Sequence, residues 1–147
     1  MLKELSKQIF ETIPPAMRIV RNEMRAAAKS SLTVPQFRVL ANLNRGLKHI
    51  TEISENLGVS QPAMSRLVEG LAKRNLIERT PSLVDRRSIT LELTFEGRKL
   101  FNKVKRSASK QFESKLSNLT KEELAELLSS LSCIENIFNR FKDSEKS

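Results

Sequence analysis

Four polar side chains between residues 60 and 66 carry hydrogen-bonding groups suited to DNA bases. Gln61 can make a two-point contact with adenine and Arg66 with guanine, while Ser60 and Ser65 can bond to a base or a phosphate. On a helix, Gln61, Pro62, Ser65 and Arg66 fall on one face together with Glu69, and Ser60 directly precedes them. The pattern predicts a recognition helix in the major groove of duplex DNA. The competing interpretation is the solvated face of an ordinary helical bundle.

A second candidate contact lies between two stretches with strand-like composition, residues 76–80 and 89–93. They flank a polar loop, which predicts a β-hairpin with an extended tip. The tip carries Arg86 and Arg87, and arginine is favoured in a narrow minor groove by its strong negative potential. Asp85 would brace the tip by pairing with one arginine. The alternative is a surface ion pair without function.

These side chains need a helix-turn-helix to position them. Apolar spacing over 50–57 predicts a short helix capped by Thr51 and ended by Gly58. Ser60 then caps the recognition helix. Its predicted buried stripe consists of Ala63, Leu67 and Leu71. Gly70 lies inside that helix, where it indicates close packing against a neighbour.

The helix before this motif has a well-marked start. Thr33 and Gln36 form a capping box with Pro35 in the first turn, and the helix should stop at Gly46. After the hairpin, Thr94 caps a long helix. Together these elements predict a mainly α fold with a small β-hairpin wing.

Apolar seams on the first and last helices predict an interface between two copies of the chain. Pro14 and Pro15 predict a break near Thr12, with residues 2–11 as a separate helical segment. A capping box at Thr120 opens the last helix. The predicted dimerisation residues are Phe10, Ile13, Met17, Leu124, Leu127, Leu131, Ile134 and Phe138. The alternative is that these helices pack only within one subunit.

Composition narrows the functional classes. The 147 residues suffice for one domain, and the net charge of +9 favours a polyanionic partner, although it also fits plain solubility. A single cysteine, Cys133, excludes an internal disulfide and fits a reducing cytoplasm. We expect a soluble cytoplasmic protein without membrane contact. No nucleophile, phosphate-binding loop or metal-ligand cluster is evident, so we expect no enzyme activity, metal or cofactor.

The segments ISENLGVSQPAMSRLVEGLAKRNL (53–76) and DRRSITLELTFEG (85–97) resemble the MarR family of winged-helix regulators. The second carries Asp85, Arg87, Leu93, Thr94 and Gly97 where the family pattern has them. The resemblance implies a homodimer on pseudo-palindromic duplex DNA, with Arg87 in the minor groove and Asp85 holding the wing. One departure is Ser82-Leu83-Val84, where members often have Asp-Pro-Arg.

The predicted domain organisation is a single MarR-type domain. Residues 32–94 form the winged helix-turn-helix lobe, and 1–31 with 95–147 form the helical dimerisation region. The predicted function is a repressor. The family resemblance further implies that it responds to an unidentified small-molecule effector, bound in a cleft lined by the first, second and fifth helices. The alternatives are a winged-helix protein-interaction module and a low-specificity architectural DNA-binding protein.

Overall fold

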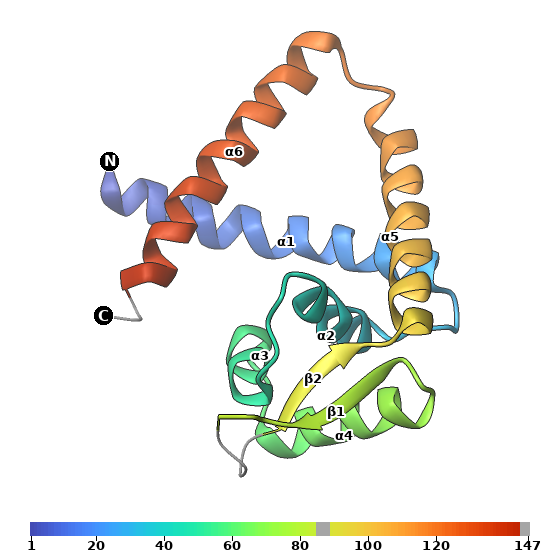
Figure 1. Cartoon of the computed structure of the whole chain (residues 1–147). Helices are drawn as coiled ribbons and strands as arrows, with labels where there is room; N and C mark the ends of the chain where they lie inside the picture. Colours follow the sequence, from blue (N-terminus) through green and yellow to red (C-terminus); the bar gives the residue numbers. More distant parts are fainter. Residues whose placement is uncertain (85–88, 145–147) are drawn as a thin grey trace. The chain divides into compact units, whose positions relative to one another are not determined.

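The computed structural model describes residues 1–84 and 89–144 and is mainly helical with one two-stranded hairpin (Figure 1). Two compact units are formed, Met1–Ser109 and Lys110–Ser147. The elements, in chain order, are α1 (Leu2–Ala28), α2 (Val34–Asn44), α3 (Ile50–Leu57), α4 (Gln61–Lys73), β1 (Ile77–Pro81), β2 (Ile89–Leu93), α5 (Phe95–Leu116) and α6 (Lys121–Ser144). The predicted fold class is therefore confirmed.

Helix α1 is continuous, so the predicted break near Thr12 is wrong. Pro14 and Pro15 lie inside the helix. Each removes one backbone donor, which leaves the carbonyls of Phe10 and Glu11 without their usual i+4 partners. Both residues are exposed, so water can satisfy these oxygens. Because these two carbonyls can be hydrated, the helix can continue through both prolines at a lower cost in free energy.

Helix α2 begins as predicted. The Thr33 hydroxyl accepts from the Gln36 backbone N–H at 3.3 Å, and the Gln36 side chain accepts from the Thr33 N–H at 3.0 Å. Both bonds form within four residues, which is why sequence reasoning finds them. The chain turns out of the helix at Gly46, whose φ of +94° suits glycine.

Helix α3 covers the predicted residues 50–57, but its N-cap lies two residues before the predicted cap, Thr51. His49 holds the N-cap position in an extended conformation. It forms a β-bridge with Thr90, while the Leu91 N–H donates to the Lys48 carbonyl at 2.8 Å. Pairing with β2 therefore decides where the helix starts. The predicted end is confirmed, since Gly58 caps α3 in the left-handed region with φ of +65°.

Helix α4 buries Met64, Val68 and Leu71, whereas Ala63 and Leu67 are only half-buried. The predicted stripe was thus placed one residue too early along most of its length. The reason is that Met64, four residues after the Ser60 cap, enters the core completely. Gly70 is not closely packed either, because a β-carbon there would meet only the Gln36 Nε2 atom, at 3.8 Å.

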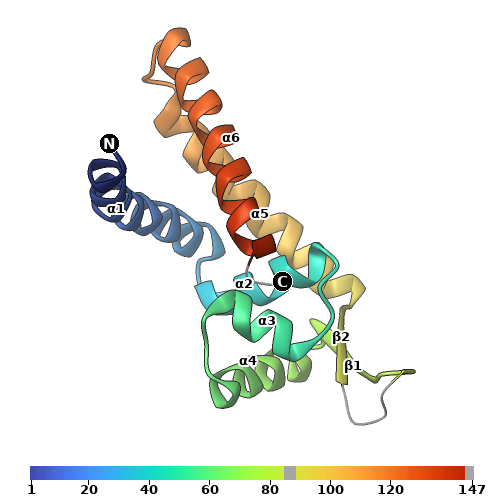
Figure 2. The ribbon, with the colours of Figure 1, turned by 90° about the vertical axis from the view of Figure 1, so that its left-hand side faces the viewer.

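The hairpin pairs β1 and β2 antiparallel, with Ile77 opposite Leu93 and Pro81 opposite Ile89. Figure 2 shows it beside α4, with α2 and α3 completing the lobe. The side chains that this lobe buries most fully come from α2, α3, α4 and β2. They are Val39, Leu40, Ile53, Met64, Val68, Leu71 and Leu91.

Helix α5 is anchored to the lobe by its first turns. The Thr94 hydroxyl accepts from the Gly97 N–H at 2.9 Å and donates to the Asn75 carbonyl at 2.7 Å. The rings of Phe37 and Phe101 lie 5.1 Å apart between centroids. The predicted Thr94 cap is therefore confirmed, and it also ties α5 to the end of the α4 segment.

In the second unit, α6 opens with the predicted capping box. The Glu123 carboxylate accepts from the Thr120 N–H at 2.8 Å, and the Thr120 hydroxyl accepts from the Glu123 N–H at 3.2 Å. No α6 residue of the described chain is buried. Among the helices in residues 1–84 and 89–144, none has both the length and the apolar character needed to cross a membrane.

Candidate nucleic-acid interface

The turn between α3 and α4 aims the start of α4 outward. The Val59 N–H donates to the Ser54 carbonyl at 3.1 Å, which closes the turn around Gly58. The Ser60 hydroxyl then accepts from the Ala63 N–H at 3.3 Å. Because this cap bond uses the Ser60 oxygen, Ser60 serves the helix start as well as the surface.

All five predicted recognition residues are exposed at the start and along the outer face of α4. They are Ser60, Gln61, Pro62, Ser65 and Arg66. Further along this helix, the Glu69 carboxylate pairs with the Lys73 ammonium at 3.0 Å. A hydrogen bond and charge from Lys73 hold the pKa of Glu69 below its ordinary value, with a smaller contribution from Arg79. Glu69 therefore remains ionised beside a cation.

Sequence reasoning missed the partner of Gln61. The Gln61 Nε2 group donates to the Ser54 hydroxyl at 3.1 Å, and that hydroxyl donates to the Thr51 carbonyl at 2.9 Å. Ser54 is buried, with 3% of its surface exposed. The available signal was a hydroxyl directly after Ile53, inside the apolar spacing of α3.

A hydrogen-bonded asparagine pair, in which Asn42 is buried and Asn56 is exposed, fixes α3 against α2. The Asn56 Nδ2 group donates to the Asn42 Oδ1 atom at 2.9 Å, and the Asn42 Nδ2 group donates to the Arg38 carbonyl at 2.8 Å. Asn42 is buried, so each bond avoids the cost of an unpaired polar group. The two helices before the recognition helix are thereby held in a defined arrangement.

The predicted wing residues Asp85, Arg86 and Arg87 lie outside the described residues. At the other end of the hairpin, the Lys48 ammonium contacts the Glu92 carboxylate at 2.8 Å. The hydrogen bond and charge from Lys48 lower the pKa of Glu92. This pair joins the segment before α3 to β2, so it supports the base of the wing.

Loop residues Leu83 and Val84 follow β1 and are almost fully exposed. A serine turn precedes them, in which the Val84 N–H donates to the Ser82 hydroxyl at 3.3 Å. These apolar side chains cannot supply the charged phosphate contacts that an Asp-Pro-Arg sequence would offer.

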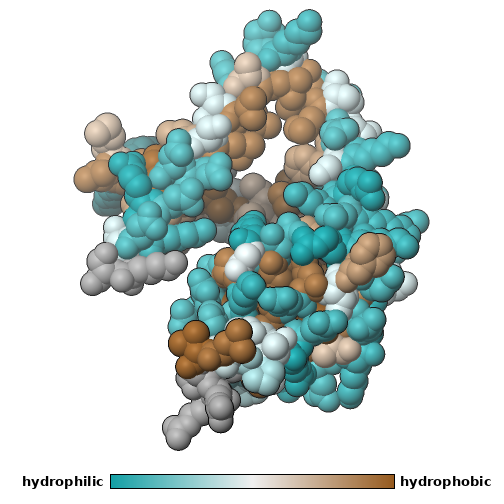
Figure 3. Space-filling model, viewed as in Figure 1, coloured by the Kyte–Doolittle hydropathy of each residue, from teal (hydrophilic) through white to brown (hydrophobic). Residues whose placement is uncertain are grey.

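The residues predicted to dimerise have large exposed surfaces in the single chain. In α1, Phe10 is 77% exposed and Met17 41%, while Ile13 is half-buried. In α6 the exposed large apolar residues are Leu124, Leu127, Leu128, Leu131, Ile134, Phe138 and Phe141. Apolar side chains are open to view along α6 (Figure 3). Such stripes are typical of surfaces that become covered on association.

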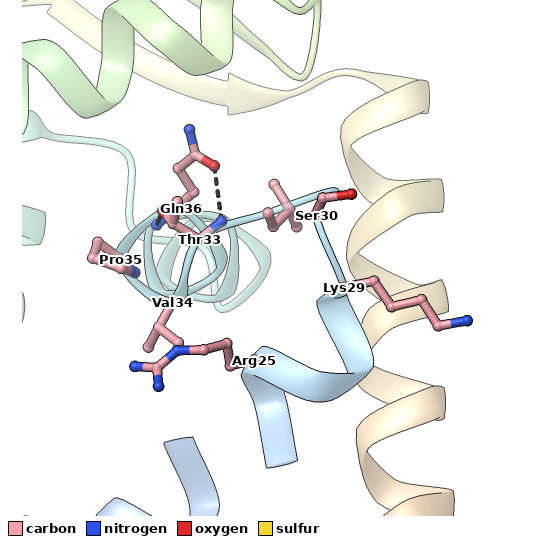
Figure 4. A pocket seen from close by; sticks show the side chains of 8 residues that line it. Arg25, Lys29, Ser30, Thr33, Val34, Pro35 and Gln36 are labelled. Carbon is pink, nitrogen blue, oxygen red and sulfur yellow. Dashed lines mark hydrogen bonds between the residues drawn. The ribbon is translucent and has the colours of Figure 1, made fainter. Parts of the chain in front are cut away.

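A cavity of about 330 Å³ lies where α1 ends and α2 begins (Figure 4). Its lining comes from α1, the connecting segment and α2, and α5 contributes none of it. Arg25 and Val34 both line the cavity, and in Figure 4 the Lys29 side chain points away from them. The dashed bond is the Thr33–Gln36 cap. The cavity thus combines cationic and apolar groups.

Comparisons with known proteins agree with this architecture. A family model described as "MarR family" matches residues 30–88. The "HTH-type transcriptional repressor MdtR" of Bacillus subtilis (strain 168) is 35% identical over 123 residues, covering 82% of this chain and 76% of that protein.

Two solved structures extend the similarity. "Transcriptional repressor, CouR, bound to a 23-mer DNA duplex" has a TM-score of 0.70 and 30% identity, covering 92% of this chain and 97% of that one. Apo MarR from E. coli has a TM-score of 0.78 at 21% identity, covering 84% and 94%. This second likeness is one of fold.

Proposed function

Because the chain belongs to the MarR family, we propose that it regulates transcription by binding specific sites in double-stranded DNA. The observation that carries the proposal is the outer face of α4. It presents Gln61, Ser65 and Arg66 to solvent directly after a capped helix start. These side chains match the edges of adenine and guanine in the major groove. A net charge of +9 supplies the sequence-independent attraction to phosphates.

In this proposal, the wing supplements the helix. Arg87 enters the minor groove beside the site read by α4, Asp85 braces the tip, and Arg86 contributes further positive charge. The described base of the hairpin supports the proposal, since Lys48 and Glu92 tie it to the start of α3. The wing and the recognition helix would then approach DNA together.

The active species in the proposal is a homodimer on a pseudo-palindromic site. The exposed apolar stripe of α6 and the exposed side chains of α1 favour association of two copies. Residues 1–31 and 95–147 would form the dimerisation region, and 32–94 the DNA-binding lobe. Two recognition helices would then lie roughly 34 Å apart, about one turn of DNA.

We further propose that the regulator represses and responds to a small molecule. MdtR and CouR are both named repressors, which supports the first part. The cavity between α1 and α2 supports the second, because Arg25 offers a cation beside the apolar Val34. A ligand there would change DNA affinity only by the difference in its affinity for two arrangements of the protein.

The test is selection of binding sites from random duplex DNA, followed by affinity measurements with the selected duplex and a scrambled one. A specific regulator should prefer the selected duplex by roughly a thousandfold or more. Binding should also weaken steeply between about 50 and 200 mM salt. Equal affinity for the selected and the scrambled duplex would favour an architectural DNA-binding protein. Failure to bind either duplex would favour a protein-interaction module.

A further inference from the structure

We propose that Ser54 is a positioning residue that sets the base preference of Gln61. This rests on the proposed function, because it assumes that Gln61 meets a base edge. Ser54 belongs to α3 and is buried, whereas Gln61 is exposed at the first turn of α4. The bond between their side chains connects the interior of the motif to its DNA-facing surface.

The hydrogen-bond arrangement decides which end of the Gln61 carboxamide faces Ser54. A serine hydroxyl has one proton, and that of Ser54 is directed to the Thr51 carbonyl at 2.9 Å. The Ser54 oxygen can therefore only accept from Gln61. The Nε2 group satisfies it at 3.1 Å, whereas an inverted carboxamide would place two acceptors against each other.

This orientation leaves a defined set of groups for DNA. The carboxamide nitrogen has two hydrogens, and one of them is used by Ser54. The oxygen and the second hydrogen remain, and adenine requires one acceptor and one donor at its major-groove edge. An untethered glutamine could also rotate its nitrogen toward the acceptors of guanine or thymine. We infer that Ser54 biases Gln61 toward contact with adenine.

Removing the Ser54 hydroxyl should leave the fold intact. Alanine has a higher helix propensity than serine, and Gln61 is exposed, so water can replace the lost partner. The Asn42–Asn56 pair and the buried Ile53 continue to hold α3 in place. The Ser54→Ala variant therefore tests the hydrogen bond between Ser54 and Gln61, called the tether below, without disturbing the fold.

The experiment uses the full chain and a duplex selected by the wild-type protein from a random pool. Affinities are measured for that duplex and for all single base-pair variants of it. Gln61→Ala identifies the base pair at which Gln61 discriminates. We expect Ser54→Ala to lose about threefold to tenfold of the discrimination at that same pair, which corresponds to one neutral hydrogen bond.

Two features separate positioning from a general structural effect. In the Gln61→Ala background, Ser54→Ala should change nothing further at that base pair. The salt dependence should equal that of the wild type, because no phosphate contact is lost. Ser132→Ala is the matched control, since its hydroxyl also donates to a helix carbonyl, that of Leu128, but in α6. It should retain full discrimination.

A measurement without DNA provides a second readout. The side-chain amide of Gln61 should show restricted motion by NMR relaxation in the free wild-type protein and greater motion in Ser54→Ala. Equal mobility in the two proteins would overturn the tether. The assigned role would be overturned if Ser54→Ala kept its base-pair discrimination or lost affinity equally for every duplex. It would also be overturned if Gln61→Ala reduced discrimination at no base pair. A wild-type protein without sequence preference would refute the proposed function itself, and the inference with it.

Discussion

The backbone carbonyl of Leu76 fills the space that a side chain on Gly97 would need. A β-carbon at Gly97 would lie 2.8 Å from the Leu76 carbonyl carbon and closer still to its oxygen. The same oxygen accepts from the Thr94 N–H at 3.2 Å. The first turn of α5 therefore packs directly on the backbone that enters β1.

Gly97→Ala should destabilise the protein by about 3 kcal/mol, because the new methyl group must displace backbone rather than a flexible side chain. Urea denaturation followed by circular dichroism measures the free energy of unfolding. Gly70→Ala is the control, since its nearest neighbour is the end of the Gln36 side chain at 3.8 Å. That variant should gain about 0.5 to 1 kcal/mol from helix propensity. Equal effects of the two variants would contradict this packing.

Ile134→Glu should convert the proposed dimer into monomers, because it places a charge in the apolar stripe of α6. Sedimentation equilibrium at micromolar concentration gives the mass directly. Ser129→Glu adds the same charge on another face of this exposed helix and should remain dimeric. If the wild-type chain sediments as a monomer, the proposed dimer is wrong.

Lys48→Gln should raise the pKa of Glu92 toward its ordinary value, since the hydrogen bond and charge of Lys48 lower it. The lowered pKa means that the pair stabilises the fold above the ordinary carboxyl pKa. That stabilisation is lost as the pH falls through the lowered value. Both side chains are more than half exposed, so the effect on stability should be small.

NMR titration of the side-chain carboxyl carbons measures this shift for each residue. Lys73→Gln is the control, because Lys73 is the main cause of the lowered pKa of Glu69. It should raise the pKa of Glu69 and leave that of Glu92 unchanged. A shift of both carboxyls in either variant would indicate a general change in charge rather than two separate pairs.

Arg87→Ala should weaken binding to the selected duplex and reduce the slope of log affinity against log salt by about one. The reason is the loss of one cation from the proposed minor-groove contact. Lys121→Ala removes the same charge at the start of α6 and should bind DNA like the wild type. Similar losses in both variants would attribute the effect to net charge and contradict the wing assignment.

Local signals made most of the fold predictable from sequence. The capping boxes at Thr33 and Thr120 and the turn at Gly58 depend on residues three or four apart, and all three are found as predicted. The N-cap of α3 was assigned to Thr51 instead of His49, because a distant strand holds His49 in place. The buried face of α4 was misassigned because the core admits Met64 and Val68 more deeply than Ala63 and Leu67.

The candidate site was predictable in its residue types and less so in its internal contacts. Helical spacing placed Gln61, Ser65 and Arg66 on one face, and all three are exposed. Spacing could not reveal the bond from Gln61 to Ser54, because it depends on the angle between α3 and α4. The sequence also could not show that the cavity beside α2 is lined without any residue of α5.

The backbone pairing of Lys48 and His49 with β2 makes the hairpin a mechanical extension of the helix-turn-helix. A displacement of the hairpin base is therefore transmitted to the start of α3 through backbone hydrogen bonds, not through a flexible loop. In the proposed DNA complex, contacts made by the wing and by α4 would therefore be coupled. If the wing moved along the duplex by one base pair, α4 would have to move with it.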